Sequence, residues 1–150
     1  MSLEENKAIA RRYVEEGWSN PKALDDLLAE EIAWPGAYPI EVTTSRDDIK
    51  ASWSEIRASF PDARSTIELM VAERDQVVVE WKFKATHTGE WMDIPPTNKE
   101  VEWYIWVWFQ IADGKIVAMD QIWSSLLFLN QLGLSPKFQE IIEQAKGKQE

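Results

Sequence analysis

Residues 101–123 read VEWYIWVWFQIADGKIVAMDQIW, and this stretch decides the fold that the sequence predicts. Every second side chain from Val101 to Ile111 is apolar, which is the period of a strand with one face in a core. Asp113-Gly114 is a typical hairpin turn, so residues 116–123 are predicted to return as an antiparallel strand. Two long paired strands are therefore the best-defined part of the structure.

Two earlier segments show the same two-residue period. Residues 64–71 predict a strand in which Ile67, Leu69 and Val71 share the inner face. Residues 77–87 predict a second strand, and its apolar face comprises Val77, Val79, Trp81, Phe83, Ala85 and His87.

The segment before residue 61 follows helical spacing instead. It predicts an amphipathic helix over residues 4–16, and a second helix from Pro21 that carries apolar residues as far as Ile32. A third helix begins at Ser45, which forms a capping pair with Asp48, and ends before Pro61. Two more helices are predicted over residues 126–132 and after Ser135-Pro136.

Helices followed by antiparallel strands are typical of an α+β fold. The simplest packing wraps a curved antiparallel sheet around the amino-terminal helices. This gives a cone-shaped half-barrel with an apolar cavity. We expect residues 1–150 to form one domain, because they contain no repeat, low-complexity tract or linker, and we expect a disordered tail from about residue 146.

Composition argues against several classes of partner and site. Lys and Arg number 16 against 26 Asp and Glu, and a net charge of −10 disfavours nucleic acid and anionic membranes. Without cysteine, and with His87 as the one histidine, zinc–thiolate and multi-histidine metal sites are excluded, while an all-carboxylate site stays open. The chain shows no apolar run of membrane-spanning length and no signal peptide, so a cytoplasmic location is predicted.

Three motifs carry a family resemblance: GEWMDIPPT at residues 89–97, FQIADGKI at 109–116 and QLG at 131–133. From residue 4 to residue 133 the chain resembles the SnoaL-like polyketide cyclases. They belong to the superfamily of nuclear transport factor 2 and ketosteroid isomerase. The resemblance implies the same cone-shaped α+β fold and a symmetric homodimer. It also implies intramolecular aldol ring closure of a polyketide ester, without a metal or an organic cofactor.

In the cyclases that this chain resembles, an aspartate on the last strand serves as general acid and base. Its companions are a glutamine and a histidine on the preceding strand and an asparagine before a proline. Carried over by position, the four places hold Gln121, Ile105, Val107 and Trp34, so none of the four residues is kept. Because an amide does not titrate, Gln121 can orient a substrate oxygen but cannot accept a proton.

Two other side chains are candidates for moving the proton. His87 lies on an apolar face, where desolvation favours the neutral ring that acts as a base. The alternative is a half-buried histidine that hydrogen-bonds a neighbouring loop. Asp120 would face the cavity if a two-residue Asp113-Gly114 turn paired Val107 with Asp120.

We favour a three-residue turn, Ala112-Asp113-Gly114, with a bulge at the glycine. It pairs Val107 with Met119 and Ile105 with Gln121. The inner face then carries Gln121, and Asp120 turns to the outer face. Val117, Met119 and Trp123 are expected to join Gln121 on the inner side.

The sequence contains nine tryptophans, and several fall on inward-facing positions, where they either contact a ligand or fill the core. The predicted ligand contacts are Trp34, Tyr38, Trp91, Trp103, Ile105, Val107, Met119 and Trp123. On the opposite face of the sheet, an aromatic stripe predicts a homodimer interface formed by Tyr104, Trp106 and Trp108.

Together these features predict an aromatic-rich pocket for a small polyketide-, terpenoid- or steroid-like molecule. The expected chemistry is that of a cofactor-independent cyclase, isomerase or lyase, in which Gln121 holds the substrate oxygen and His87 or Asp120 moves the proton. Two alternatives stay open. One is a non-catalytic dimer that binds a small molecule, and the other is an adaptor whose outer aromatic face binds another protein.

Overall fold

The computed structural model describes residues 1–35, 42–134 and 146. Tyr38 and the helix expected after Pro136 lie outside these residues, as does nearly all of the expected tail. The described elements, in chain order, are α1 (Leu3–Glu16), α2 (Ala23–Leu27), β1 (Leu28–Trp34), β2 (Val42–Ser45), α3 (Arg46–Ser59), β3 (Arg64–Glu73), β4 (Gln76–Thr86), β5 (Glu100–Ala112), β6 (Lys115–Trp123) and α4 (Ser125–Leu132).

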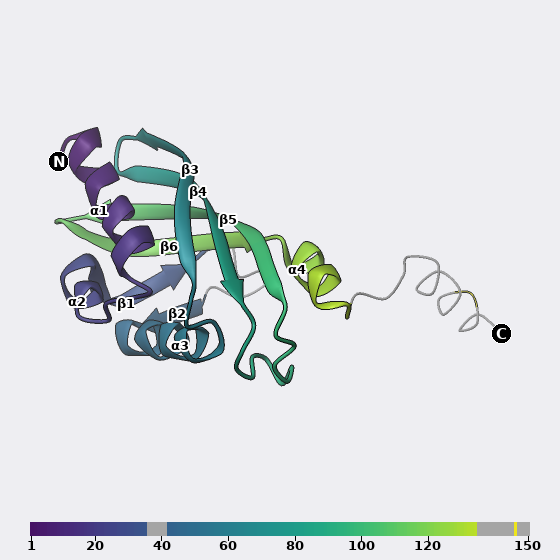
Figure 1. The fold of residues 1–150 in the computed structure, drawn as a ribbon. Coiled ribbons are helices and arrows are strands. Elements are labelled where there is room, and N and C mark those ends of the chain that lie inside the picture. Colours follow the sequence, from purple (N-terminus) through teal and green to yellow (C-terminus); the bar gives the residue numbers. More distant parts are fainter. Residues whose placement is uncertain (36–41, 135–145, 147–150) are drawn as a thin grey trace.

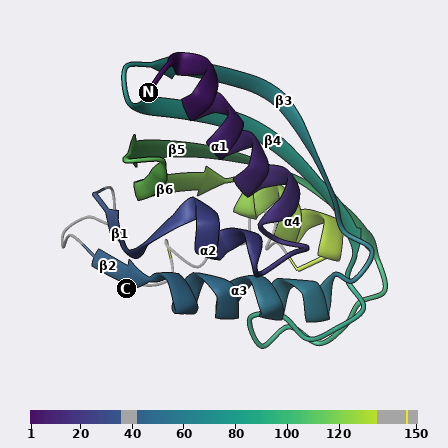
Figure 2. The same ribbon diagram turned by 90° about the vertical axis from the view of Figure 1, so that its left-hand side faces the viewer.

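One curved sheet organises the structure (Figure 1). It has six strands in the order β2-β1-β6-β5-β4-β3. Neighbouring strands are antiparallel except β1 and β6, which run parallel, so the sheet is mixed. On its concave side α1 packs against β3 and β4, and α3 packs against β1 and β2 (Figure 2). The predicted α+β half-barrel around the amino-terminal helices is confirmed. The sheet was predicted to be antiparallel and is mixed instead, because β1 runs parallel to β6.

The second predicted helix is wrong beyond Leu27. Leu28 has extended dihedral angles, φ −104° and ψ 145°, and residues 28–34 form β1. Leu28 and Ile32 are both buried, and their spacing of four residues fits one face of a strand as well as one face of a helix. Pairing with β2 and β6 therefore decides the conformation of this segment.

The predicted inner face of β3 is also wrong beyond Ile67. Glu68 is an extra residue between Ile67 and Leu69, which makes a β-bulge in the pairing with β4. The bulge turns Leu69 and Val71 to the exposed side, while Met70 packs against the core. A bulge of this kind reverses the alternation that the sequence pattern assumes.

A bulge also determines the register between β5 and β6. The turn holds two residues, Asp113 and Gly114, with φ 50° and 78°. Val117 then forms a bulge, and this shifts the rest of β6 by one residue so that Gln121 lies opposite Val107.

The favoured pairings of this hairpin are therefore wrong. Met119 pairs with Phe109 rather than Val107, and Ile105 pairs with Trp123 rather than Gln121. The alternative that paired Val107 with Asp120 is wrong as well. The bulge nevertheless produces the expected faces: Gln121 and Trp123 point to the concave side, and Asp120 lies on the outer side opposite Trp108. Val117 is half-buried at the bulge itself.

Aromatic rings from several elements meet at one end of the half-barrel. The ring centroid of Phe60 lies 5.6 Å from that of Trp91, 5.4 Å from that of Trp103 and 6.0 Å from that of Phe128. Phe83 packs against Trp103, and Trp123 packs against Phe128. We name this group the Phe60 cluster, and it consists of Phe60, Phe83, Trp91, Trp103, Trp123 and Phe128.

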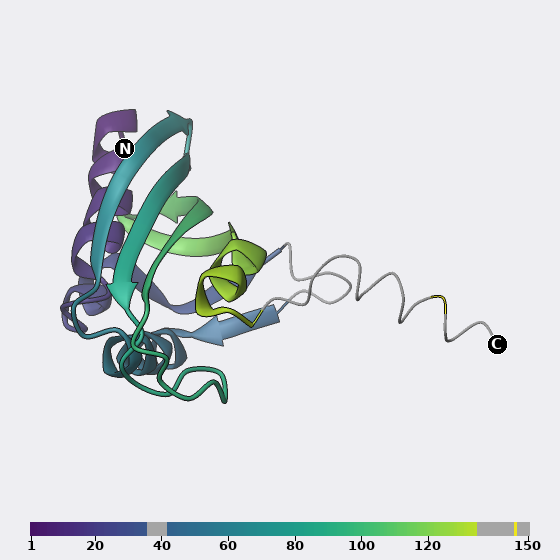
Figure 3. The same ribbon diagram turned by 45° about the vertical axis from the view of Figure 1, so that its right-hand side comes forward.

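α4 lies beside β5 beyond the end of β6 (Figure 3). The side chains of Gln131 on α4 and of its N-cap Ser124 bond backbone groups of β5 there, in place of a neighbouring strand. The Gln131 side-chain amide accepts a hydrogen bond from the backbone N–H of Glu102 and donates one to the Glu102 carbonyl, each at 2.6 Å. The Ser124 hydroxyl accepts one from the backbone N–H of Tyr104 at 2.9 Å. These contacts satisfy backbone groups of β5 that would otherwise be unpaired.

His87 anchors the loop between β4 and β5. Its side chain is fully buried and stacks on Phe60, with ring centroids 5.2 Å apart. Nδ1 lies 3.1 Å from the Thr97 hydroxyl, and the His87 backbone N–H donates to the carbonyl of Lys99. Burial lowers the pKa of His87 below its usual 6.5 and outweighs the opposing contact with the Gly89 backbone.

We predict that Gln131→Ala lowers the free energy of unfolding by about 1–2 kcal/mol, because it leaves two backbone groups of Glu102 without their partners. Denaturant unfolding measures the change. Asn130→Ala on the same helix is the control and should leave stability nearly unchanged. Equal effects of the two substitutions would contradict the role of the Gln131 amide.

We predict that the wild-type protein loses stability as the pH falls below about 6.5, because the unfolded chain binds a proton at His87 before the folded protein does. The loss continues until the pH reaches the lowered pKa of the folded protein. The control is His87→Asn, which keeps an acceptor for Thr97 and does not titrate. Urea unfolding of both proteins from pH 7.5 to pH 5 should show the steeper loss for wild type, and parallel curves would contradict the prediction.

Candidate functional site

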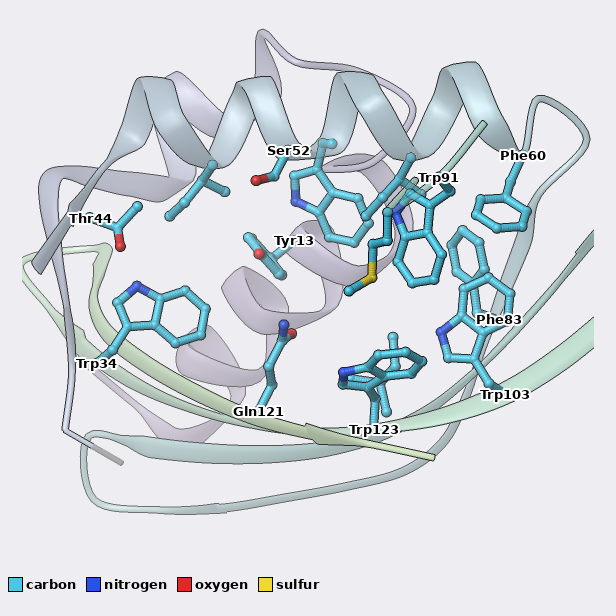
Figure 4. Close-up of a pocket in the computed structure, with 15 residues that line it drawn as sticks. Tyr13, Trp34, Thr44, Ser52, Phe60, Phe83, Trp91, Trp103, Gln121 and Trp123 are labelled. Carbon is cyan, nitrogen blue, oxygen red and sulfur yellow. The ribbon is translucent and has the colours of Figure 1, made fainter. Parts of the chain in front are cut away.

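A cavity of about 400 Å³ lies between the concave face of the sheet and helices α1 and α3 (Figure 4). Every strand from β4 to β6 contributes lining side chains, as do β1, β2 and the loop after β4. The lining is mostly apolar and aromatic, which is typical of a binding site for a small organic molecule.

The cavity has two unlike ends (Figure 4). At the aromatic end its walls are rings of the Phe60 cluster, namely Phe60, Phe83, Trp91, Trp103 and Trp123. The opposite end is lined by Trp34 and Thr44, and the polar side chains of Tyr13, Ser52 and Gln121 lie between the two ends. A ligand with a ring system and one oxygen function matches this distribution of side chains.

Gln121 is one of the three polar side chains in the middle of the cavity, and it comes from β6. Its side chain points from the sheet toward α1, where Tyr13 lies (Figure 4). The neutral amide can donate to a ligand oxygen and can accept from a ligand hydroxyl. Asp120, the preceding residue, is turned away from the cavity, and its Oδ1 accepts a hydrogen bond from the Gln121 backbone N–H at 2.9 Å.

Tyr13 supplies a second hydroxyl group from α1. Burial raises the pKa of Tyr13 to about 12, so the phenol stays protonated at neutral pH. Its hydroxyl lies 3.7 Å from the sulfur of Met119, to which it donates a weak hydrogen bond. Among the lining residues that the structure describes, Tyr13 is the one titratable side chain.

His87 does not line the cavity, although it was a candidate for the proton acceptor. It is enclosed behind Phe60 and bonded to Thr97, as described for the loop after β4. The placement matches the alternative in which the histidine bonds a neighbouring loop, except that its burial is complete. Asp120 is likewise outside the cavity, so neither candidate is within reach of a molecule bound there.

The predicted ligand contacts divide into three groups. Residues that line the cavity are Trp34, Trp91, Trp103, Ile105 and Trp123. Val107 and Met119 are buried in the core and do not line it. Tyr38 lies outside the described residues.

Sequence reasoning missed several residues of the cavity lining. Ser52 lies three residues after Ile49 and directly before Trp53 on α3, so helical spacing could have placed it beside the inward face. Thr44 could not be found in this way, because β2 was not predicted. Met92, at the mouth of the cavity, is 67% exposed and carries no signal in the sequence pattern.

The outer face of the sheet presents the aromatic stripe that the sequence predicts. Trp106 is 43% exposed, and the neighbouring Ile122 on β6, which pairs with it, is 77% exposed. Trp108 donates from Nε1 to the Gln76 side chain at 3.1 Å. Tyr104 is half-buried on the same face of β5.

Two other kinds of feature are absent from the described part of the chain. No group of three or more His, Cys, Asp or Glu side chains there is arranged to hold a metal ion. No helix there combines the length and the apolar character needed to cross a membrane.

Solved structures of known proteins share this architecture. AclR from Streptomyces galilaeus superposes with a TM-score of 0.76 at 25% identity, covering 98% of this chain and 92% of AclR. IdmH from Streptomyces antibioticus gives a TM-score of 0.71 at 25% identity, over 89% of this chain and 99% of IdmH. A Catenulispora acidiphila protein with a ketosteroid isomerase-like fold gives 0.66 at 19% identity, over 84% and 92% of the two chains, and shows the fold alone.

Sequence comparison agrees with the structural comparison. None of the curated proteins is significantly similar to the chain in sequence. The family model described as SnoaL-like polyketide cyclase, however, matches residues 8–132, from α1 to the end of α4. The chain therefore belongs to the SnoaL-like polyketide cyclase family.

Proposed function

We propose that the cavity binds a small, uncharged and mainly apolar molecule of polyketide, terpenoid or steroid type. This proposal rests on one observation: the cavity of about 400 Å³ has aromatic walls at one end and the Gln121 amide near its middle (Figure 4). Aromatic walls favour a ring system, and the amide favours one oxygen function. IdmH is provisionally assigned as a polyketide cyclase, which supports a ligand of this kind.

Binding without acid/base turnover is the version of this function that we favour. Among the described lining residues only Tyr13 titrates, and a pKa of about 12 keeps its proton in place at neutral pH. Ring closure or isomerisation needs a group that accepts a proton near that pH. AclR, provisionally assigned as a hydroxylase, indicates that the shared fold does not dictate one reaction.

We also propose that two copies of the chain pair through the outer face of the sheet. Trp106 and Ile122 form an exposed apolar patch at the centre of this face, flanked by Glu80 on β4 and Asp120 on β6. Aromatic residues inside a polar rim are typical of the core of a protein interface. A twofold axis through Trp106 would bring the same patch of both copies together.

We predict that the wild-type protein binds prodan, a neutral fluorescent naphthyl ketone, but turns over no activated ketone or polyketide ester. Gln121→Asp should gain turnover, because it places a carboxylate where the amide points into the cavity. Gln121→Asn is the control of equal length and should gain none. Product formation is followed by chromatography.

Wild-type turnover with a bell-shaped pH profile would contradict binding without catalysis and favour a cyclase or isomerase. Failure of the wild-type protein to bind prodan or any of the ketones and esters would contradict the ligand cavity itself.

We predict that the wild-type protein elutes with twice the 17.4 kDa of the chain and that Trp106→Glu shifts it to the monomer. The two new carboxylates would face each other across the twofold axis in a buried interface. Their desolvation and mutual repulsion would oppose pairing. Leu3→Glu, at an exposed leucine of α1, is the control and should stay dimeric. Size-exclusion chromatography with light scattering measures the mass of each protein in solution. A wild-type monomer at micromolar concentration would overturn the proposed dimer and favour a different protein as the partner of this face.

A further inference from the structure

The loop between β4 and β5 holds one wall of the cavity on a turn of unusual conformation. Trp91 and Ile94 exchange two backbone hydrogen bonds, of 3.0 and 2.9 Å, around Met92 and Asp93. Met92 has φ 52° and Asp93 has φ 60°, so both central residues are in the left-handed region. Such a two-residue turn is normally occupied by Asn-Gly or Asp-Gly. Neither residue here is a glycine, and the turn is strained.

Both ends of the loop are pinned to the rest of the fold. On the first side, the backbone N–H groups of Thr88 and Gly89 donate to the carbonyl of Ser59, and the Ser59 hydroxyl bonds the loop at Glu90. A side chain at Gly89 would lie 2.5 Å from the Ala58 carbonyl oxygen, so this contact is close-packed.

On the second side, His87 and its neighbours hold the end of the loop. The backbone N–H of Asn98 donates to the carbonyl of His87 at 2.8 Å, and the His87 ring bonds Thr97. Residues 91–96, which we name the flap, are thus a short segment between two fixed ends.

The flap covers the aromatic end of the cavity on its solvent side. Trp91 points inward and packs on Phe60, Trp123 and Phe128, and both Trp91 and Met92 line the cavity. Met92 is also largely exposed, so it stands where the cavity meets the outside. Moving the flap outward removes one aromatic wall and opens the aromatic end.

We propose that the flap is an entrance through which a ligand reaches the aromatic end of the cavity, and that strain in the Met92-Asp93 turn favours opening of the flap. The inference rests on the proposed ligand cavity and adds the route of entry. Strain in the closed turn raises the population of the open form, because the open flap no longer needs two residues at positive φ. A glycine at position 93 relieves that strain and holds the flap closed for longer.

The test compares wild type, Asp93→Gly and Asp113→Gly. Asp113 also has a positive φ of 50°, but it belongs to the β5–β6 turn, outside the cavity lining. The two substitutions therefore relieve the same kind of strain at the entrance and away from it. Stopped-flow mixing with prodan gives the rates of binding and release, and amide hydrogen exchange at Trp91 and Ile94 reports opening of the flap without any ligand.

In Asp93→Gly we expect exchange at Trp91 and Ile94 to slow by about fivefold, with prodan binding and release slowed by the same factor and its Kd changed less than twofold. Asp113→Gly should leave all of these values as in wild type. Unchanged exchange in Asp93→Gly would contradict the claim that strain in the Met92-Asp93 turn favours opening of the flap. Slowed exchange with unchanged prodan rates would overturn the entrance while leaving the cavity intact. If wild type does not bind prodan, the cavity and the entrance are both overturned.

Discussion

The packing of Phe60 is the interaction on which the rest of the structure depends. This ring directly follows α3 and is fully buried, and it touches rings from the β4–β5 loop, β5 and α4. It also stacks on His87, which ties the loop to the end of β4. One side chain therefore links the end of α3 to the sheet, the β4–β5 loop and α4 at the aromatic end of the cavity. Aromatic pairs of this kind contribute about 0.5–1.5 kcal/mol each beyond the burial of their area.

The same rings explain why the cavity has an aromatic end. They meet at the end of α3 that leads into Phe60, and the cavity extends from them toward Gln121 and Trp34 (Figure 4). Stability and the proposed ligand binding therefore involve the same side chains. Trp103 packs on Phe83 and on Phe128 while its ring also faces the cavity. A tryptophan in such a position is at once part of the core and part of the cavity wall.

Local sequence patterns predicted most of the fold, because strand alternation and helix caps depend on residues that are close together in the sequence. The capping pair of Ser45 and Asp48 and the apolar face of β4 are confirmed in this way. β1 was missed because Leu28 and Ile32 fit both periods, and only pairing with distant strands separates the two. At the site, strand alternation correctly predicted that Trp103 and Ile105 face the cavity. The burial of His87 was not predicted, because it depends on packing against Phe60, which is distant in the sequence. The two bulges could not be predicted, because an extra residue in one strand can be recognised only from its pairing with the neighbouring strand.

The bulge at Val117 has a consequence for how this family could change its chemistry. Asp120 and Gln121 are adjacent, and one unpaired residue upstream decides which of them lies opposite Val107. If β6 lay flat against β5, the carboxylate would turn toward the cavity and the amide would turn away. A gain or loss of a single residue in this hairpin can therefore exchange a neutral cavity for a charged one, with neither side chain mutated. Chain length, as well as side-chain identity, is a variable by which evolution or a designer could add or remove an acid at this site.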